Sequence, residues 1–150
     1  MKTFSKIIMV FGIVMLMTSF RTFPLENSYT LTIKVDGLRN SEGVVQFALY
    51  NRDGAIPDEN FKEYYKMATS DINGGSAAFT FFNLPLGKYA VNVLHDENEN
   101  GKIDKGLILP KEGIGFSNYE TINLMNRPKF SKASFQLSKN STQRVKIIYL

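Results

Sequence analysis

Several short stretches of this chain have the apolar patterns of β-strands: residues 29–35 and 88–95 alternate apolar and polar residues, whereas 44–50 and 76–82 are mostly apolar. Gly, Asn or Pro residues, which favour turns, lie between most of these stretches. The stretches are 29–35, 44–50, 76–82, 88–95, 133–137 and 144–149. No long segment repeats its apolar residues with the period of an amphipathic helix. The pattern therefore predicts one all-β domain of about seven short strands, built as an antiparallel β-sandwich of the immunoglobulin-like or transthyretin-like type.

The segments between the strands give further local predictions. Residues 83–87 contain Pro and Gly and are predicted to form a tight connection. Residues 139–142 are predicted to form a hairpin turn between the last two strands, and residues 107–119 a loop. A short helical turn is expected within residues 57–67. Its aromatic side chains are expected to face inward, and these are Phe61, Tyr64 and Tyr65.

The N-terminal residues have the pattern of a secretory signal peptide. Two lysines and no acidic residue precede residues 7–17, which are apolar apart from one glycine. A transmembrane helix needs about 20 apolar residues, so this run is short for a permanent anchor. We therefore expect a signal peptide at residues 1–22, a linker at 23–28 and a single domain at 29–150, with an uncleaved anchor as the alternative. Export would place the domain in the periplasm or outside the cell, with no membrane span after cleavage.

Charge and cysteine content narrow the function classes. The leader holds three of the 18 basic residues and no acidic residue, so the rest carries 15 basic and 14 acidic residues, a net charge near +1. The clustered positive charge of a nucleic-acid-binding domain is therefore not expected. The chain has no Cys, which excludes disulfides, thiolate metal sites and cysteine nucleophiles.

The clearest chemical signal follows the alternating stretch 88–95. Oxygen-bearing side chains occur there at alternate positions, followed by Gly101 and a further carboxylate, as in the first half of an EF-hand loop. Position 12 of that pattern is Leu107 instead of Glu, so any ion must take a ligand from further along the chain. The candidate Ca²⁺ ligands are Asp96, Asn98, Asn100, Lys102 through its carbonyl oxygen, Asp104 and Glu112. Binding is expected to be weak, with a Kd of about 10⁻⁴–10⁻³ M.

The alternative is that the same residues only form a turn. Asp and Asn side chains accept hydrogen bonds from the backbone two residues on, and Asn100-Gly101 is a strong turn signal. The sequence leaves both interpretations open.

Three segments of the second half together form a longer motif. They read Phe82-Asn83-Leu84-Pro85-x-Gly87-x-Tyr89-Ala90-Val91, His95-Asp96-x-Asn98-x-Asn100-Gly101-Lys102-x-Asp104 and Pro110-Lys111-Glu112-Gly113-x-Gly115-Phe116-Ser117-Asn118. This combination closely resembles the exported bacterial family catalogued as domain of unknown function 2141. The resemblance covers nearly all of the chain after the leader and implies an exported small β-sandwich with no established activity. A looser similarity runs to prealbumin-like and surface-adhesin β-domains, some of which bind Ca²⁺ at the corresponding loop.

Other chemistry-bearing residues favour a non-enzymatic protein. His95 is the only histidine, so a typical zinc site cannot form, and we expect it to anchor a loop by hydrogen bonding. A triad of Ser117, His95 and an acid lacks the G-x-S-x-G elbow. The glycines of residues 113–118 are expected to allow close backbone approach while Phe116 plugs the end of the sandwich. The other possibility is a binding surface shared with Lys111 and Glu112.

The expected role is that of a structural or binding module of the cell envelope. Its partner would be an envelope protein or a glycan that the sequence does not identify. In the competing interpretation, a glycan or peptide binds on the side of residues 113–119 and residues 96–104, the acidic loop, form only a turn. The chain has no Trp, and the aromatic residues proposed to be exposed for sugar stacking are Tyr64, Tyr65 and Tyr119.

Overall fold

The protein was analysed as a computed structural model, which describes residues 27–107 and 109–150. The predicted signal peptide, residues 1–22, lies outside the described residues, and so does most of the predicted linker at 23–28. The described part of the chain contains no helix with the length and apolarity needed to cross a membrane.

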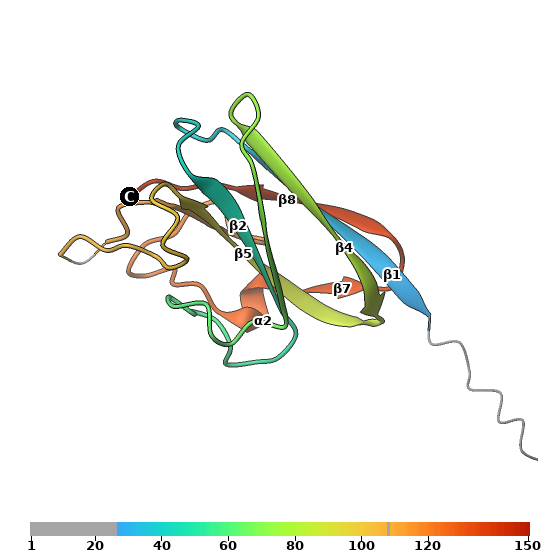
Figure 1. The fold of residues 1–150 in the computed structure, drawn as a ribbon. Coiled ribbons are helices and arrows are strands. Elements are labelled where there is room, and N and C mark those ends of the chain that lie inside the picture. The colour runs from blue at the N-terminus through green and yellow to red at the C-terminus, as the bar shows by residue number, and fades with distance from the viewer. Residues whose placement is uncertain (1–26, 108) are drawn as a thin grey trace, which may run out of the picture.

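The described residues fold into two β-sheets, with one short helix near the C-terminal end (Figure 1). One sheet has the order β4-β1-β8, and the other has the order β3-β2-β5-β6 with β7 also paired to β5. The elements are β1 (Ser28–Asp36), β2 (Val44–Tyr50), β3 (Lys66–Ser70), β4 (Ser76–Pro85), β5 (Gly87–Asp96), β6 (Gly113–Phe116), α2 (Phe130–Ala133), β7 (Phe135–Leu137) and β8 (Ser141–Lys146). The predicted all-β class is confirmed, with eight strands instead of about seven.

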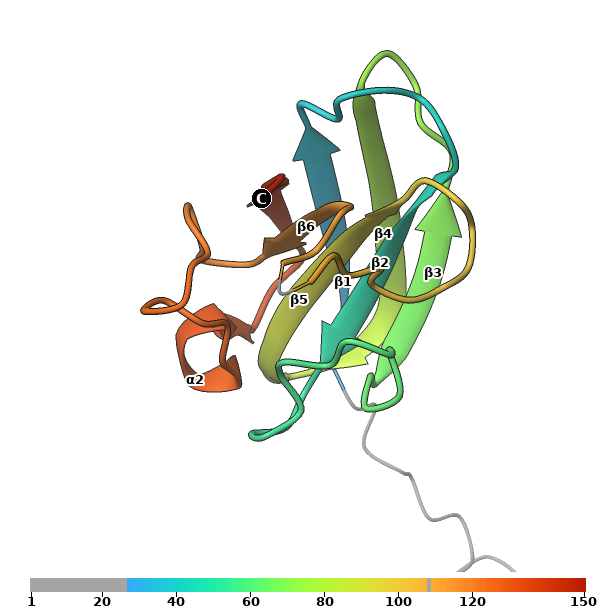
Figure 2. The ribbon, with the colours of Figure 1, turned by 90° about the vertical axis from the view of Figure 1, so that its left-hand side faces the viewer.

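Apolar side chains form two cores, one between the sheets and one on the outer face of the larger sheet. The first takes alternate residues of both sheets, such as Ile33 of β1, Phe47 of β2 and Val91 of β5. The second lies on the opposite face of β2, β5 and β6, where the intervening loops and α2 cover it. Figure 2 shows α2 beside β5. Because both of its faces are covered, β5 is buried along almost its whole length.

The C-terminal strands differ from the prediction in their pairing. Strand β8 runs parallel to β1, from the pair Leu31–Ser141 to the pair Asp36–Lys146, so the sheets are not wholly antiparallel. The predicted hairpin at residues 139–142 is also wrong, because β7 pairs with β5 in one sheet and β8 with β1 in the other. The chain crosses between the sheets here, and the Asn140 side chain accepts a hydrogen bond from the Thr30 N–H at 2.9 Å.

Two loop predictions also need correction. Residues 57–65 form turns and bends without a helix, and the Asp58 carboxylate fixes them by accepting hydrogen bonds from the Tyr50 hydroxyl and the Glu63 N–H. Phe61 is buried there as expected, whereas Tyr64 and Tyr65 are 41% and 39% exposed.

The predicted loop at 107–119 contains strand β6, whose two glycines allow the C-terminal segment to pack against it. A Cβ at Gly113 would lie 2.5 Å from the Tyr149 ring, and one at Gly115 would lie 2.5 Å from the Lys146 carbonyl oxygen. The predicted structural role of these glycines is confirmed, but Phe116 does not plug the end of the sandwich, because β6 places its side chain in the outer core.

Candidate functional site

The acidic loop begins at the last residue of β5 and closes on that residue's side chain. Asp96 is 2% exposed, and its two carboxylate oxygens accept hydrogen bonds from the N–H groups of Asn100 and Gly101 at 3.1 and 2.7 Å. Gly101 has a φ of +75°, which an L side chain rarely adopts. The buried carboxylate thus folds the following residues back over the end of the strand.

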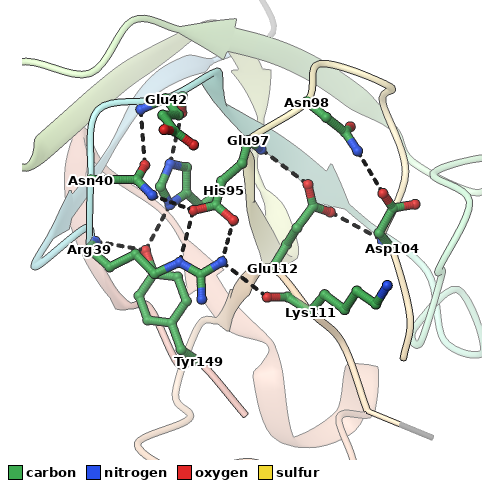
Figure 3. A network of polar contacts seen from close by, with 10 residues as sticks. All are labelled: Arg39, Asn40, Glu42, His95, Glu97, Asn98, Asp104, Lys111, Glu112 and Tyr149. Atoms are coloured by element: carbon green, nitrogen blue, oxygen red, sulfur yellow. Dashed lines mark hydrogen bonds and ion pairs between the residues drawn. The ribbon is translucent and has the colours of Figure 1, made fainter. Parts of the chain in front are cut away.

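Alternating amide side chains shape the rest of the loop. The Asn98 Oδ1 accepts a hydrogen bond from the Asn100 N–H at 3.1 Å, and the Asn100 Oδ1 accepts one from the Lys102 N–H at 3.0 Å. These are the two-residue Asx contacts that the spacing predicted. The Asn98 Nδ2 donates to the Asp104 Oδ2 at 2.6 Å, so the two sides of the loop meet (Figure 3).

Glu112 holds the two ends of the acidic loop together. Its side chain is 4% exposed, and its two oxygens accept hydrogen bonds from the N–H groups of Glu97 and Asp104, each at 3.1 Å (Figure 3). Burial raises the pKa of the Glu112 carboxyl, and the nearby Asp96 and Asp104 charges also raise it. The hydrogen bond from Asn98 lowers the pKa of the exposed Asp104 carboxyl. Glu112, which was predicted as a further ligand from downstream, therefore lies against the loop.

All six predicted ligand residues belong to this loop or support it, but most of their side-chain oxygens accept hydrogen bonds within the loop. Within residues 27–107 and 109–150, no three His, Cys, Asp or Glu side chains converge closely enough to hold a metal ion. A cation here would have to use amide and backbone carbonyl oxygens together with the carboxylates. This donor set suits a hard ion such as Ca²⁺, which binds carboxylate, amide and carbonyl oxygens alike.

His95 joins three segments that lie far apart in the sequence. It is fully buried, and its Nε2 lies 3.0 Å from the Glu42 carbonyl oxygen while its Nδ1 lies 2.7 Å from the Tyr149 hydroxyl (Figure 3). A carbonyl oxygen only accepts, so we assign the proton to Nε2 and the accepting role to Nδ1. The Tyr149 oxygen in turn accepts a hydrogen bond from the Arg39 N–H at 3.0 Å. The predicted loop-anchoring role of His95 is confirmed.

Glu97 takes part in a charge cluster that the sequence did not predict. Its carboxylate forms an ion pair with the Arg39 guanidinium and accepts a hydrogen bond from the Asn40 side chain at 2.6 Å. These partners lower its pKa, with the hydrogen bond from Arg39 as the main cause. The guanidinium also stacks over the Tyr149 ring, 4.7 Å from its centroid. Glu97 is therefore held by the β1–β2 connection, away from the other acidic side chains of its loop.

Two residues considered from the sequence for other chemistry are buried and already hydrogen bonded. The Ser117 hydroxyl donates to the Ala133 carbonyl oxygen at 2.7 Å and accepts from the Val91 N–H at 2.9 Å. Tyr119 is 2% exposed, and its hydroxyl bonds to the backbone of Arg127 and Lys129. The proposal of Tyr119 as an exposed platform for a sugar is therefore wrong.

A half-enclosed cavity of about 280 Å³ lies on the outer face of β6. The sequence did not predict it, because its walls come from loops that are separate in the chain. Its apolar walls include Pro57, Ile103, Leu109, Ile114, Phe116 and Leu124. The acidic loop thus leads directly into one wall of this cavity through Ile103.

Residues 33–146 match the model of a family described as an uncharacterized protein conserved in bacteria, DUF2141. The chain belongs to this family. The DUF2141 match runs from within β1 to the end of β8, so it includes both sheets, the acidic loop and Glu112. The predicted family membership is confirmed. No curated protein and no solved structure matches the chain.

Proposed function

We propose that this DUF2141 protein is an exported, non-enzymatic β-sandwich of the immunoglobulin-like or transthyretin-like type that binds Ca²⁺ weakly and serves as a structural or binding module of the cell envelope. The observation that carries the Ca²⁺ proposal is the closed acidic loop. Asp96 and Asn98 shape it from one side, and the contact between Asn98 and Asp104 brings its two sides together.

The chemistry of the loop favours a hard divalent cation. Four acidic residues lie within nine positions, and only Glu97 has an ion-pair partner among the described residues. Each carboxylate oxygen has more than one lone pair, so an oxygen that accepts an N–H can also face a cation. The ligand set would be Asp96, Asn98, Asn100, the Lys102 carbonyl oxygen, Asp104 and Glu112. Ca²⁺ would reduce the charge repulsion and thereby stabilise the domain.

The test is calorimetric titration with Ca²⁺ together with thermal unfolding. At a Ca²⁺ concentration tenfold above Kd, mass action adds about 1.4 kcal/mol to the free energy of unfolding. That corresponds to a rise in Tm of about 5 °C for a domain of this size. Absence of both binding heat and a Tm shift at millimolar Ca²⁺ would refute the proposal.

A matched pair of variants distinguishes coordination of Ca²⁺ from attraction of cations by the negative charge of the loop alone. Asp104→Asn removes a negative charge together with one ligand oxygen, whereas Glu99→Gln removes the same charge from a loop side chain outside the proposed ligand set. We expect Asp104→Asn to weaken Ca²⁺ binding at least tenfold and Glu99→Gln to change it by less than about threefold, as screening of an exposed charge allows. Equal effects would show that the loop attracts cations without coordinating them.

The competing proposal, a peptide- or glycan-binding module with a purely structural acidic loop, also has a specific observation in its favour. Both oxygens of Asp96 and both oxygens of Glu112 already accept backbone N–H groups, so the loop is closed by its own hydrogen bonds. Under this proposal Ca²⁺ leaves the Tm unchanged. Export is tested separately, by determining the N-terminus of the protein recovered from the cell by mass spectrometry.

A further inference from the structure

Large apolar side chains are exposed on two loops that lie on one side of the molecule. One loop joins the acidic loop to β6, and the other lies between β6 and α2. Leu107 and Met125, which are almost fully exposed, stand at their tips. Half of the large apolar side chains that are exposed in the described residues belong to these loops and the adjoining C-terminal residue; they are Leu107, Leu109, Leu124, Met125 and Leu150.

The two loops form one surface. The cavity over β6 is lined from both, by Leu109 on one side and Leu124 on the other. A second, shallower hollow continues from Leu109 to Leu107. In Figure 2 both loops lie on the β6 side of the molecule. We call residues 105–107, 109–111 and 121–132 the two-loop surface.

Charge on the two-loop surface has a single sign. Its charged residues are Lys105, Lys111, Arg127, Lys129 and Lys132, and it contains no Asp or Glu. Among the described residues only Lys105 of this set forms an ion pair, with Glu59. The Lys132 ammonium is held beside the second loop by the Asn126 side chain and lies 4.5 Å from the centroid of the Tyr119 ring. The surface holds five of the 15 basic residues that follow the leader and none of the 14 acidic ones, so its net charge is +5 while that of the remaining residues is −4.

We infer that the two-loop surface docks on an anionic lipid bilayer. Apolar loop tips would enter the interface between headgroups and acyl chains, and the basic residues behind them would lie at the level of the headgroups. The charge pattern favours this occupant, because an anionic bilayer offers negative charge and apolar depth over the same area. The exposed apolar residues at the tips are single side chains on irregular loops. A fluid bilayer accepts such side chains directly, whereas a protein partner would need a preformed pocket for each.

The experiment is co-sedimentation of the processed protein with vesicles of phosphatidylcholine alone or mixed equally with phosphatidylglycerol. We expect binding only to the anionic vesicles and its loss at high NaCl. Arg127→Gln/Lys129→Gln should weaken binding by about fivefold for each charge removed. Leu124→Ser/Met125→Ser should abolish the retained fraction while leaving the circular dichroism spectrum unchanged, because both side chains are exposed.

The matched control variants change exposed residues near the other end of β5, away from the two-loop surface. Phe82→Ser/Leu86→Ser removes two side chains of similar exposure next to the β4–β5 turn, and Lys88→Gln/Lys139→Gln removes two exposed charges. These variants should bind as the unmodified protein does. Binding without preference for phosphatidylglycerol, or equal losses in the control variants, would overturn the inference. An absence of vesicle binding would also overturn it. If the protein then formed dimers that Leu124→Ser/Met125→Ser dissociates, the surface would be a protein interface.

Discussion

Substitution of Gly43 by Ala tests whether the β1–β2 connection is fitted closely against the acidic loop. Gly43 precedes β2, has a φ of +64° and packs against the end of β5. A Cβ at this position would lie 2.0 Å from the Asp96 carbonyl oxygen and 2.8 Å from the Glu97 Cα. Both neighbours are backbone atoms, one in the last residue of β5 and one in the residue after it, so a rotamer change cannot relieve the overlap.

The expected loss of stability has two parts. An L side chain in the left-handed region costs about 1–2 kcal/mol. Relief of the overlap requires the connection to move away from β5, which breaks the hydrogen bond between His95 Nε2 and the Glu42 carbonyl oxygen. A hydrogen bond of this kind contributes about 0.5–1.5 kcal/mol. We therefore expect Gly43→Ala to lower the free energy of unfolding by about 1.5–3.5 kcal/mol, a large part of the about 5–15 kcal/mol typical of a domain.

Gly54→Ala is the matched control. Gly54 has a φ of +77°, but no atom lies within 4 Å of a Cβ built there. This variant should show the conformational cost of about 1–2 kcal/mol alone. Urea unfolding followed by circular dichroism, with equal m-values, measures both losses. If the two variants lose the same free energy, the close packing of Gly43 on β5 does not contribute and the reasoning fails.

Two further predictions concern the buried polar groups. Glu112→Gln leaves one acceptor oxygen for the N–H groups of Glu97 and Asp104, so the free energy of unfolding should fall by about 2–4 kcal/mol, measured by urea unfolding; a change below about 0.5 kcal/mol would contradict the role of Glu112. Burial raises the pKa values of Tyr50, Tyr89 and Tyr149, so the folded protein holds these protons more tightly than the unfolded chain. Stability should therefore be constant just below pH 10, about the ordinary tyrosine pKa, and should fall as the pH rises above it; a urea midpoint that does not change up to about pH 11 would refute this.

The strands that were predicted best each have one face on the inter-sheet core. Strands β1 and β5 were predicted from alternation and β2 and β4 from their apolar residues, and all four fall within a few residues of their predicted ranges. Strand β3 was missed because it is short, lies at a sheet edge and is mostly polar, and β6 because its glycines are typical of loops. Alternation indicates which face is buried and does not indicate the partner strand. The parallel pairing of β8 with β1 was therefore not predictable from it.

The candidate site divides in the same way between local and distant contacts. The hydrogen bonds of Asn98 and Asn100 span two residues, so the spacing alone predicted them. The partners of Glu97 and His95 lie more than 50 residues away in the sequence, and only the packing of the sheets brings them together. Glu112 was proposed as an ion ligand because the incomplete loop pattern required another oxygen downstream, but its hydrogen bonds to the loop backbone were not predicted.

The proposed Ca²⁺ site and the two-loop surface are adjacent in the chain and share the contacts made by Asp104. The acidic loop ends at Asp104, and the first half of the two-loop surface begins with the next residue. The Asp104 carbonyl oxygen accepts the Lys111 N–H at 2.8 Å, and the Asp104 N–H donates to the Glu112 carboxylate at 3.1 Å. These contacts close the base of the loop that presents Leu107 to solvent.

A cation bound by the Asp104 carboxylate would hold the same base more rigidly. Because a surface loop that is already ordered loses less conformational freedom on binding, Ca²⁺ would strengthen docking on a bilayer without contacting the lipid. Glu112 would be central to this coupling, since its carboxylate joins the two ends of the acidic loop even before an ion binds. This role explains why an acidic residue is buried at position 112 although burial raises the pKa of its carboxyl group.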